Sequence, residues 1–227
     1  MTIPKLSPRL RRAADFVRQD AYIADVGTDH AYLPIVLLSE GKICGGVVSD
    51  INEGPIERAR EHIRALGMTE RLLAKRCDGL SHLSEDHPED IFILGMGGEL
   101  IARILGDAPW TKDPSIRLIL QPMTHPELLR AFLLREGYSI VDEVLVKDEK
   151  IYQIICAEYA GLPSRKPYSE LELLIGREPL RRGDALCGEL LAHWQNVLSI
   201  RLVGKTGAGS NTDEEERLLK QIGEYTK

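Results

Sequence analysis

Residues 24–34 read Ala24-Asp25-Val26-Gly27-Thr28-Asp29-His30-Ala31-Tyr32-Leu33-Pro34, and this stretch decides the fold. A mostly apolar run over residues 21–24 leads into an acid, a glycine and a polar cluster, and an amphipathic segment follows at once. The pattern predicts a buried strand, a tight turn and a helix. In an open α/β sheet, such a turn presents a site at the carboxyl end of the first strand.

Apolar runs alternate with helical patterns along the first 136 residues. The predicted strands are 21–26, 43–49, 72–76, 90–94 and 116–121, and the predicted helices are 8–19, 31–40, 55–67, 98–105 and 125–136. Two further runs, 138–146 and 151–159, leave no room for a helix between them, so they should pair antiparallel. We therefore expect an α/β fold that is Rossmann-like, with a seven-stranded, mostly parallel sheet and an antiparallel edge hairpin.

The composition changes after Ala160, where glycine, proline and serine make a linker-like stretch. Helical patterns follow at 168–175, 184–203 and 212–226. The last two are joined by a glycine-rich loop at 204–211, so they should fold back as a coiled-coil-like α-helical hairpin. We predict two domains, 1–160 and 161–227.

The totals are those of an ordinary globular protein, with 43% hydrophobic and 28% charged residues. No apolar run is long enough for a membrane span and no signal-peptide core is visible, so we expect a cytoplasmic protein and favour a monomer. The net charge of −6 argues against wholesale nucleic-acid binding. Residues 1–20 nevertheless carry five basic and two acidic side chains, which leaves room for a locally basic face.

Acids close three successive predicted strands: Asp25, Asp50 and Asp78. The first turn lacks the GxGxxG loop of dinucleotide folds, and its Thr28-Asp29 pair disfavours a phosphate while tolerating a cation. Asp50 can accept the hydroxyls of a ribose, and Asp78 can accept an exocyclic amine. Together these acids suit S-adenosylmethionine, a nucleoside with a sulfonium and an ammonium. The competing interpretation of each acid is a helix cap or turn former.

The run Gly95-Met96-Gly97-Gly98 closes the fourth predicted strand. Glycines there permit close approach of the backbone to a planar ligand, although they could also serve packing alone. The six histidines show no paired-ligand spacing, so no metal site is predicted.

Several runs resemble one known family. They are LSPRLRRAADFV at 6–17, ADVGTDHAYLP at 24–34, DINEGP at 50–55, CDGL at 77–80, ILGMGGELI at 93–101, LILQPM at 118–123 and EKIYQII at 149–155. Together they are similar to the bacterial tRNA (adenine-22-N1)-methyltransferases, over about residues 5–160. The resemblance implies a class I enzyme that transfers a methyl group from S-adenosylmethionine to N1 of adenine 22 in tRNA.

The resemblance also implies roles for individual residues. The cofactor pocket would use Asp25, Gly27, Asp29, Asp50, Asn52, Asp78, Gly79 and Gly95. The face toward the target base would be lined by His30, Tyr32, Met96, Gly97, Pro122 and Met123, with Asp29, His30 and Tyr32 closest to the chemistry. The tRNA body would be held by Arg9, Arg11, Arg12 and Arg18, together with Arg177, Arg181 and Arg182. Each of these groups has a plain structural alternative, such as a helix start for His30 and a solvated helix face for the arginines.

Two positions depart from the family pattern. Cys77 stands where many members carry glycine, and Met123 stands where some carry asparagine, so a hydrogen-bonding role there is in doubt. Two other functions stay open from the sequence: methylation of another RNA or a small molecule, and a non-catalytic RNA-binding protein of the same fold.

Overall fold

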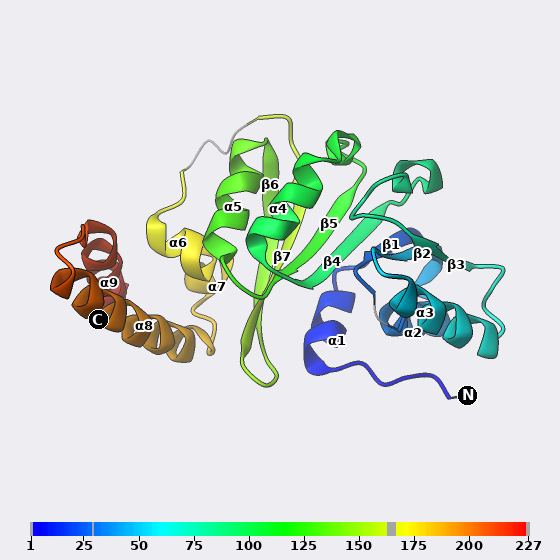
Figure 1. Cartoon of the computed structure of the whole chain (residues 1–227), viewed down its shortest axis with the longest axis horizontal. Coiled ribbons are helices and arrows are strands. Elements are labelled where there is room, and N and C mark those ends of the chain that lie inside the picture. Colours follow the sequence, from blue (N-terminus) through cyan, green and yellow to red (C-terminus); the bar gives the residue numbers. More distant parts are fainter. Residues whose placement is uncertain (1, 29, 163–166, 226–227) are drawn as a thin grey trace.

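A seven-stranded sheet forms the centre of the chain, in a computed structural model that describes residues 2–28, 30–162 and 167–225 (Figure 1). The strands are β1 Ala21–Val26, β2 Ile43–Asp50, β3 Leu72–Arg76, β4 Asp90–Met96, β5 Arg117–Pro122, β6 Tyr138–Lys147 and β7 Ile151–Tyr159. Their order is β3-β2-β1-β4-β5-β7-β6. The first five strands are parallel, and β7 is antiparallel to both of its neighbours. The predicted Rossmann-like sheet with an antiparallel edge hairpin is confirmed.

Helices cover both faces of the sheet. They are α1 Pro8–Ala14, α2 Tyr32–Ser39, α3 Glu53–Ala65, α4 Gly98–Gly106, α5 Pro126–Arg135, α6 Glu170–Ile175, α7 Arg177–Arg182, α8 Cys187–Gly207 and α9 Asp213–Tyr225, with short 3-10 turns at Leu83–Asp86 and Pro109–Thr111. Helices α1, α2 and α3 pack on one face, while α4 and α5 pack on the other. Successive strand residues alternate between these layers, as the pleat requires: Phe92 lies in the first core, and Ile91 and Ile93 lie in the second.

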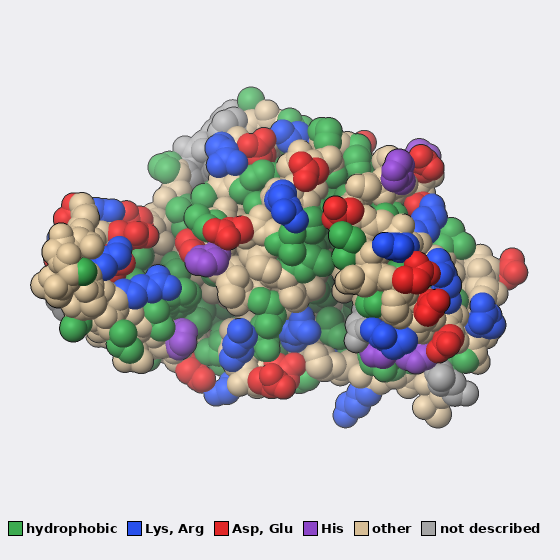
Figure 2. Space-filling model, viewed as in Figure 1, with side chains coloured by type: hydrophobic (Ala, Val, Ile, Leu, Met, Phe, Trp, Pro, Cys, Tyr) green, Lys and Arg blue, Asp and Glu red, His purple; other side chains and the backbone are tan. Residues whose placement is uncertain are grey.

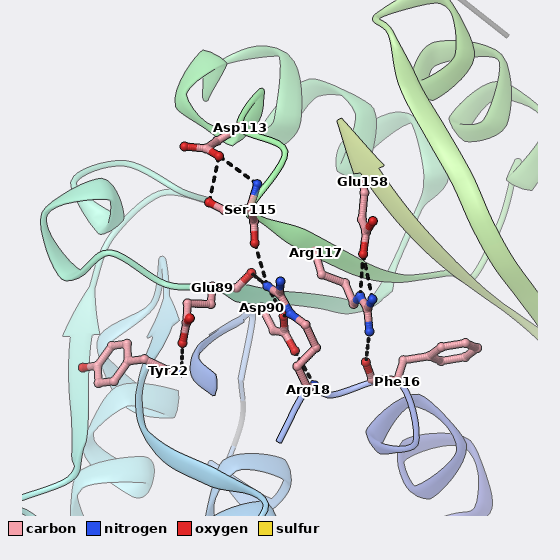
Figure 3. A network of polar contacts seen from close by, with 9 residues as sticks. All are labelled: Phe16, Arg18, Tyr22, Glu89, Asp90, Asp113, Ser115, Arg117 and Glu158. Carbon is pink, nitrogen blue, oxygen red and sulfur yellow. Dashed lines mark hydrogen bonds and ion pairs between the residues drawn. The ribbon is translucent and has the colours of Figure 1, made fainter. Parts of the chain in front are cut away.

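The segment after α1 is fastened to the amino ends of the central strands (Figure 3). The backbone N–H and the Nε–H of Arg18 both donate to the fully buried Asp90 carboxylate at 2.7 Å, and Nη2 donates to the carbonyls of Glu89 and Ser115. Arg117 pairs with Glu158 and also donates to the Phe16 carbonyl at 3.2 Å. These contacts explain why α1 ends at Ala14, earlier than predicted, because the following residues turn to meet Asp90. Arg18 is therefore engaged at the sheet edge opposite the carboxyl ends of the parallel strands.

A third core holds the C-terminal helices together and against β6 through Leu145. Figure 1 shows α8 and α9 side by side at the end of the molecule away from α1, with α6 and α7 between them and the sheet. The predicted helical hairpin is present, and α8 extends through Gly204 to Gly207, so the joining loop is shorter than expected.

The buried Arg130 on α5 joins α6 to the sheet. Its guanidinium pairs with the buried Glu143, donates to the Gln153 side chain at 2.8 Å and donates to the Leu173 carbonyl at 2.8 Å. The Gln153 amide in turn donates to the Leu174 carbonyl at 3.1 Å. The buried guanidinium of Arg130 thus joins α5 to β6, β7 and α6.

Candidate active site

The carboxyl ends of the parallel strands meet at one edge, as strand register requires. Val26 lies opposite Ser49 of β2 and opposite Ile93 of β4, and Met96 lies opposite Pro122. Asp50 is paired in register with the last residue of β3, two residues before Asp78. The structure therefore brings the three predicted acids, the glycine run and Pro122 to the same edge of the sheet.

The turn after β1 is tightly held. The backbone N–H groups of Gly27 and Thr28 both donate to the Ser49 carbonyl, at 2.8 and 3.1 Å. Gly27 has φ +79°, and a Cβ at this position would lie 2.1 Å from the Met96 Cε. The Thr28 hydroxyl accepts from the Ala31 N–H at 3.0 Å, and Ala31 itself adopts φ 57° at the start of α2. The positive φ favours glycine at position 27, whereas the flexible end of the Met96 side chain could move away from an added Cβ.

Asp25 is a buried carboxylate at this turn, with 7% of its surface exposed. Burial raises its pKa to about 6, although a hydrogen bond from the Thr28 side chain acts in the opposite direction. The protein alone therefore compensates the ionised form only in part. An acid of this kind fits a cationic ligand such as the ammonium and sulfonium of S-adenosylmethionine.

A cavity of about 180 Å³ opens beside Asp25. Its lining residues are Arg9, Leu10, Asp25, Gly27, Thr28, His30, Tyr32, Leu33 and Leu94. Asp25, Gly27, His30 and Tyr32 were predicted for the site, and the structure brings them together here. The predicted residue Asp29 lies outside the described residues.

Arg9 reaches this cavity from α1. Its guanidinium donates to the Gln121 side-chain oxygen and lies 5.3 Å from the centre of the Tyr152 ring. The neighbouring arginines behave differently, because Arg11 pairs with Glu40 at 2.8 Å and Arg12 pairs with Asp15 at 2.9 Å on the surface. Of the three α1 arginines expected to touch tRNA, Arg9 therefore lines the site, whereas Arg11 and Arg12 lie outside it.

The ends of β2 and β3 carry the other predicted cofactor residues. Asp50 Oδ1 accepts from the Asn52 N–H at 2.7 Å, which shapes the turn into α3. Asp78 and Gly79 lie in a separate hollow of about 290 Å³ between this edge and α4. Asp78 and Asn52 are exposed, so both are accessible to a ligand laid across the strand ends.

Three rings stack at the start of α2. The ring centres of His30 and Tyr32 are 4.9 Å apart, those of His30 and His62 are 5.3 Å apart, and the planes lie within about 25° of parallel. His62 Nδ1 is 3.1 Å from the His30 carbonyl oxygen. Tyr32 remains 37% exposed. The stack forms a flat aromatic wall beside the Asp25 cavity.

The sequence suggested two roles for the glycines of residues 95–98, close approach to a ligand or packing alone. The structure supports a different role for different glycines. A Cβ on Gly98 would lie 2.2 Å from the His125 carbonyl oxygen, so this glycine serves the packing of α4 against the loop after β5. Gly95 is exposed with φ +78°, and its virtual Cβ lies 3.6 Å from Arg9 Nη1. Gly97 has only the Thr124 hydroxyl close by, at 3.2 Å. Gly95 and Gly97 thus leave the backbone open toward the site.

The structure adds Tyr152 and His62 to the predicted residues, and it shows that Gln121, which closes the predicted strand 116–121, contacts Arg9. Gln121 had a signal, since it is a polar residue closing an apolar strand, as the three acids are. Tyr152 and His62 could not be identified from the sequence, because their contacts depend on sheet order and on helix placement. Pro122 is buried, while Met123 is half-buried and within 3.5 Å of the Gln121 amide.

Membrane-spanning helices and metal-binding groups can be sought in the structure. Among the described residues, no helix is both long and apolar enough to cross a membrane. Within that same part of the chain, no group of three or more histidine, cysteine, aspartate or glutamate side chains is arranged to hold a metal ion.

Comparisons with known proteins agree with this geometry. Residues 6–155 match the model of a methyltransferase domain family. The chain is 36% identical to the Bacillus subtilis tRNA (adenine(22)-N(1))-methyltransferase, over 97% of this chain and 93% of that protein. The crystal structure of the B. subtilis m1A22 tRNA methyltransferase superposes with a TM-score of 0.80 at 28% identity, covering 97% and 95% of the two chains. A Streptococcus pneumoniae protein crystallised with S-adenosyl-L-methionine gives 0.81 at 30% identity, covering 95% of this chain and all of that one.

The fold and the strand-end acids thus define an S-adenosylmethionine-dependent methyltransferase. Within that class, the chain belongs to the tRNA (adenine-22-N1)-methyltransferase family.

Proposed function

We propose that this protein transfers a methyl group from S-adenosylmethionine to N1 of adenine 22 in tRNA. The observation that carries the proposal is the meeting of Asp25, Asp50 and Asp78 at one sheet edge, in a chain 36% identical over 97% of its length to an enzyme of that name. The acids would meet the positive charge and the nucleoside hydroxyls of the cofactor.

Each residue of the cofactor seat has a distinct task in this proposal. Asp50 would accept the ribose hydroxyls and Asp78 an exocyclic amine, with Asn52 and Gly79 beside them. Asp25 would balance the ammonium, and Gly27 and Gly95 would let the backbone come close. When bound, the cofactor supplies an electrophilic methyl group on its sulfonium. Asp29 is assigned to the seat from its place in the sequence motif.

Adenine N1 carries an in-plane lone pair, so its attack needs no prior deprotonation. Alignment of the base is then the main requirement, and the His30–Tyr32 wall with Met96, Gly97, Pro122 and Met123 would provide it. Methylation leaves positive charge on the ring. The Gly95 carbonyl and the side chains of Asp29 and His30 would stabilise that charge.

N1 lies on the pairing edge of adenine, so the target base must leave its stack at a cost of a few kcal/mol. Basic side chains would hold the tRNA while this happens. On the face drawn in Figure 2, basic and acidic side chains are interspersed rather than gathered by sign, which favours a few specific contacts. Arg11 and Arg12 on α1 are suited to such contacts, because both are surface residues next to the Arg9 wall.

The wider assignments follow from the same proposal. A tRNA-modifying enzyme acts in the cytoplasm, and we propose a monomer there. Residues 1–160 would form the methyltransferase domain, and residues 161–227 would form the helical domain.

The cofactor seat is tested by calorimetric titration with S-adenosylhomocysteine. Asp50→Ala should weaken binding at least tenfold, because it removes both ribose contacts, while Glu57→Ala, an exposed charge on α3, should leave it unchanged. Equal affinity of the Asp50→Ala and wild-type proteins for S-adenosylhomocysteine would refute the assignment of Asp50 to the cofactor-binding site. Mass spectrometry of nuclease fragments of tRNA treated with the wild-type protein identifies the modified base and its position. A product other than 1-methyladenosine at position 22 would refute that assignment.

A further inference from the structure

A larger cavity, of about 450 Å³, lies between the end of β5, the β6–β7 turn and α8. Its lining residues include Pro122, Met123, Glu127, Tyr152, Trp194 and Arg201. Pro122 and Met123 also belong to the proposed target-base wall. Tyr152 is the ring on which Arg9 lies, and Arg9 lines the Asp25 cavity. The two cavities are therefore neighbours separated by a thin wall of side chains.

Aromatic and cationic side chains together make up much of this cavity. Arg201 lies 6.0 Å from the centre of the Trp194 ring, and the His193 ring meets Trp194 edge-on at 5.8 Å. On the opposite side, Lys150 lies 5.4 Å from the centre of the Tyr152 ring. Pairs of this kind can hold a flat ring by stacking and can balance a nearby phosphate.

Two polar atoms of the lining are buried without hydrogen-bond partners among the described residues. They are the indole Nε1 of Trp194, a donor, and the Oε2 of Glu127, an acceptor. Buried groups of this kind are normally satisfied, so each calls for an explanation. Both residues line the cavity, so a ligand bound there that carries both an acceptor and a donor would supply the missing partners.

A nucleobase has this combination on its edge, together with a flat face. A free phosphate is a poorer fit, because the side chains of Glu127, Glu149 and Glu189 line the same cavity. Glu189 is paired with Lys147 at 2.7 Å, which also ties the β6–β7 turn to α8. The chemistry of the lining thus favours the base of a nucleotide over its phosphate.

We propose that this cavity binds a second unpaired nucleobase of the tRNA substrate, close to the adenine that is methylated. The inference rests on the proposed function. The base stacks on Trp194, its edge engages the indole N–H and the Glu127 carboxylate, and Arg201 lies near the adjoining phosphate. The site holds the RNA strand beside the reaction centre and takes no part in the methyl transfer.

Fluorescence of a single tryptophan tests the contact directly. The chain has two tryptophans, Trp110 and Trp194, so Trp110→Phe leaves Trp194 as the only indole. Titration with a tRNA transcript in the presence of S-adenosylhomocysteine should quench its emission, with the same midpoint as tRNA binding measured by anisotropy. The reverse variant, Trp194→Phe, should show no such quenching. Bound tRNA with unchanged Trp194 emission would overturn the proposal.

Kinetics test the energetic role of the site. Trp194→Ala should raise the KM for tRNA roughly 5- to 150-fold, the range expected for loss of one stacked base. The KM for S-adenosylmethionine and kcat should stay within about twofold. Gln195→Ala, the exposed neighbour on α8, is the matched control and should change neither constant.

An unchanged KM for tRNA in a folded Trp194→Ala variant would overturn the site while leaving the proposed function intact. A wild-type protein that binds S-adenosylhomocysteine but methylates no tRNA would instead refute the proposed function. Circular dichroism and thermal melting establish that each variant is folded.

Discussion

Ionisation of the buried Asp25 carboxyl group lowers the free energy of unfolding. Its folded pKa of about 6 lies above the ordinary value of 3.8, so the folded protein binds more protons between those two pH values. The contribution of Asp25 to stability is therefore most favourable below about pH 4 and is lost as the pH rises through about 6. The loss is at most about 3 kcal/mol. We expect such a loss of unfolding free energy in a site that binds a cation, because the bound cation would compensate the buried charge.

Asp25→Asn removes the ionisation and keeps an acceptor for the Thr28 hydroxyl. We expect the variant to exceed the wild type in unfolding free energy at pH 8 by up to about 3 kcal/mol, with the gap closing toward pH 4. Urea unfolding across this range measures the difference. Affinity for S-adenosylmethionine should rise with pH through about 6 in the wild type and stay flat in the variant. A stability gain that is independent of pH would show that ionisation is not its cause.

Gly98 lies where α4 begins against the loop after β5. Gly98→Ala would place a methyl group 2.2 Å from the His125 carbonyl oxygen, a backbone atom that cannot simply rotate away. We expect a loss of about 1–3 kcal/mol in unfolding free energy by denaturant titration.

Gly204→Ala is the matched control for that change. Gly204 lies within α8 and has nothing within 4 Å of a virtual Cβ, so its alanine variant should gain up to about 1 kcal/mol. Equal effects at the two glycines would contradict the packing role of Gly98.

Arg130 holds helix α6 against the sheet through its contacts with the Leu173 carbonyl and the Gln153 side chain. Arg130→Met removes the cation and leaves the Glu143 carboxylate buried and unpaired, so we expect a loss of about 3–5 kcal/mol. Arg135→Met, at the exposed end of the same helix, should change stability by no more than about 0.5 kcal/mol. Adding Glu143→Met to the first variant should restore part of the loss. Failure of the double variant to recover would indicate that packing, not charge, dominates there.

The strands were more predictable than the helix ends. Apolar runs closed by polar residues predicted all seven strands. Five of them, β1, β2, β4, β5 and β7, are buried along most of their length, which leaves few alternatives. The end of α6 at Ile175 agrees with the predicted helix 168–175, but the short helix α7 was not predicted. Gly176 joins the two helices with φ 106° and lies against the Arg130–Glu143 pair, whose residues are far from it in the sequence. The acids of the site were visible as strand-end residues. Tyr152 was not, because its place depends on β7 entering the sheet between β5 and β6.

The assignment of residues 1–160 to a methyltransferase domain and of 161–227 to a helical domain stays a prediction, and truncation tests whether the first part folds without the second. A chain ending at residue 160 would lose the Leu173 and Leu174 carbonyls that bind Arg130 and Gln153, so we expect it to be unstable. A chain ending at Gly183 keeps α6 and α7. It should fold and bind S-adenosylhomocysteine, but it should lose tRNA methylation together with α8. Calorimetry and thermal melting of both fragments measure this. A stable, cofactor-binding 1–160 fragment would contradict the expectation.

The attachment of α1 has a consequence for synthesis on the ribosome. This helix is made first, yet its Arg9 and the segment after it bind Gln121, Tyr152, Arg117 and residues near them, which emerge more than a hundred residues later. At 5–20 residues per second, roughly 7 to 30 s pass between the synthesis of this helix and the synthesis of the residues that it contacts. During that interval its apolar face is open to chaperones. The wall that separates the two cavities is therefore completed only after about two thirds of the chain has been made.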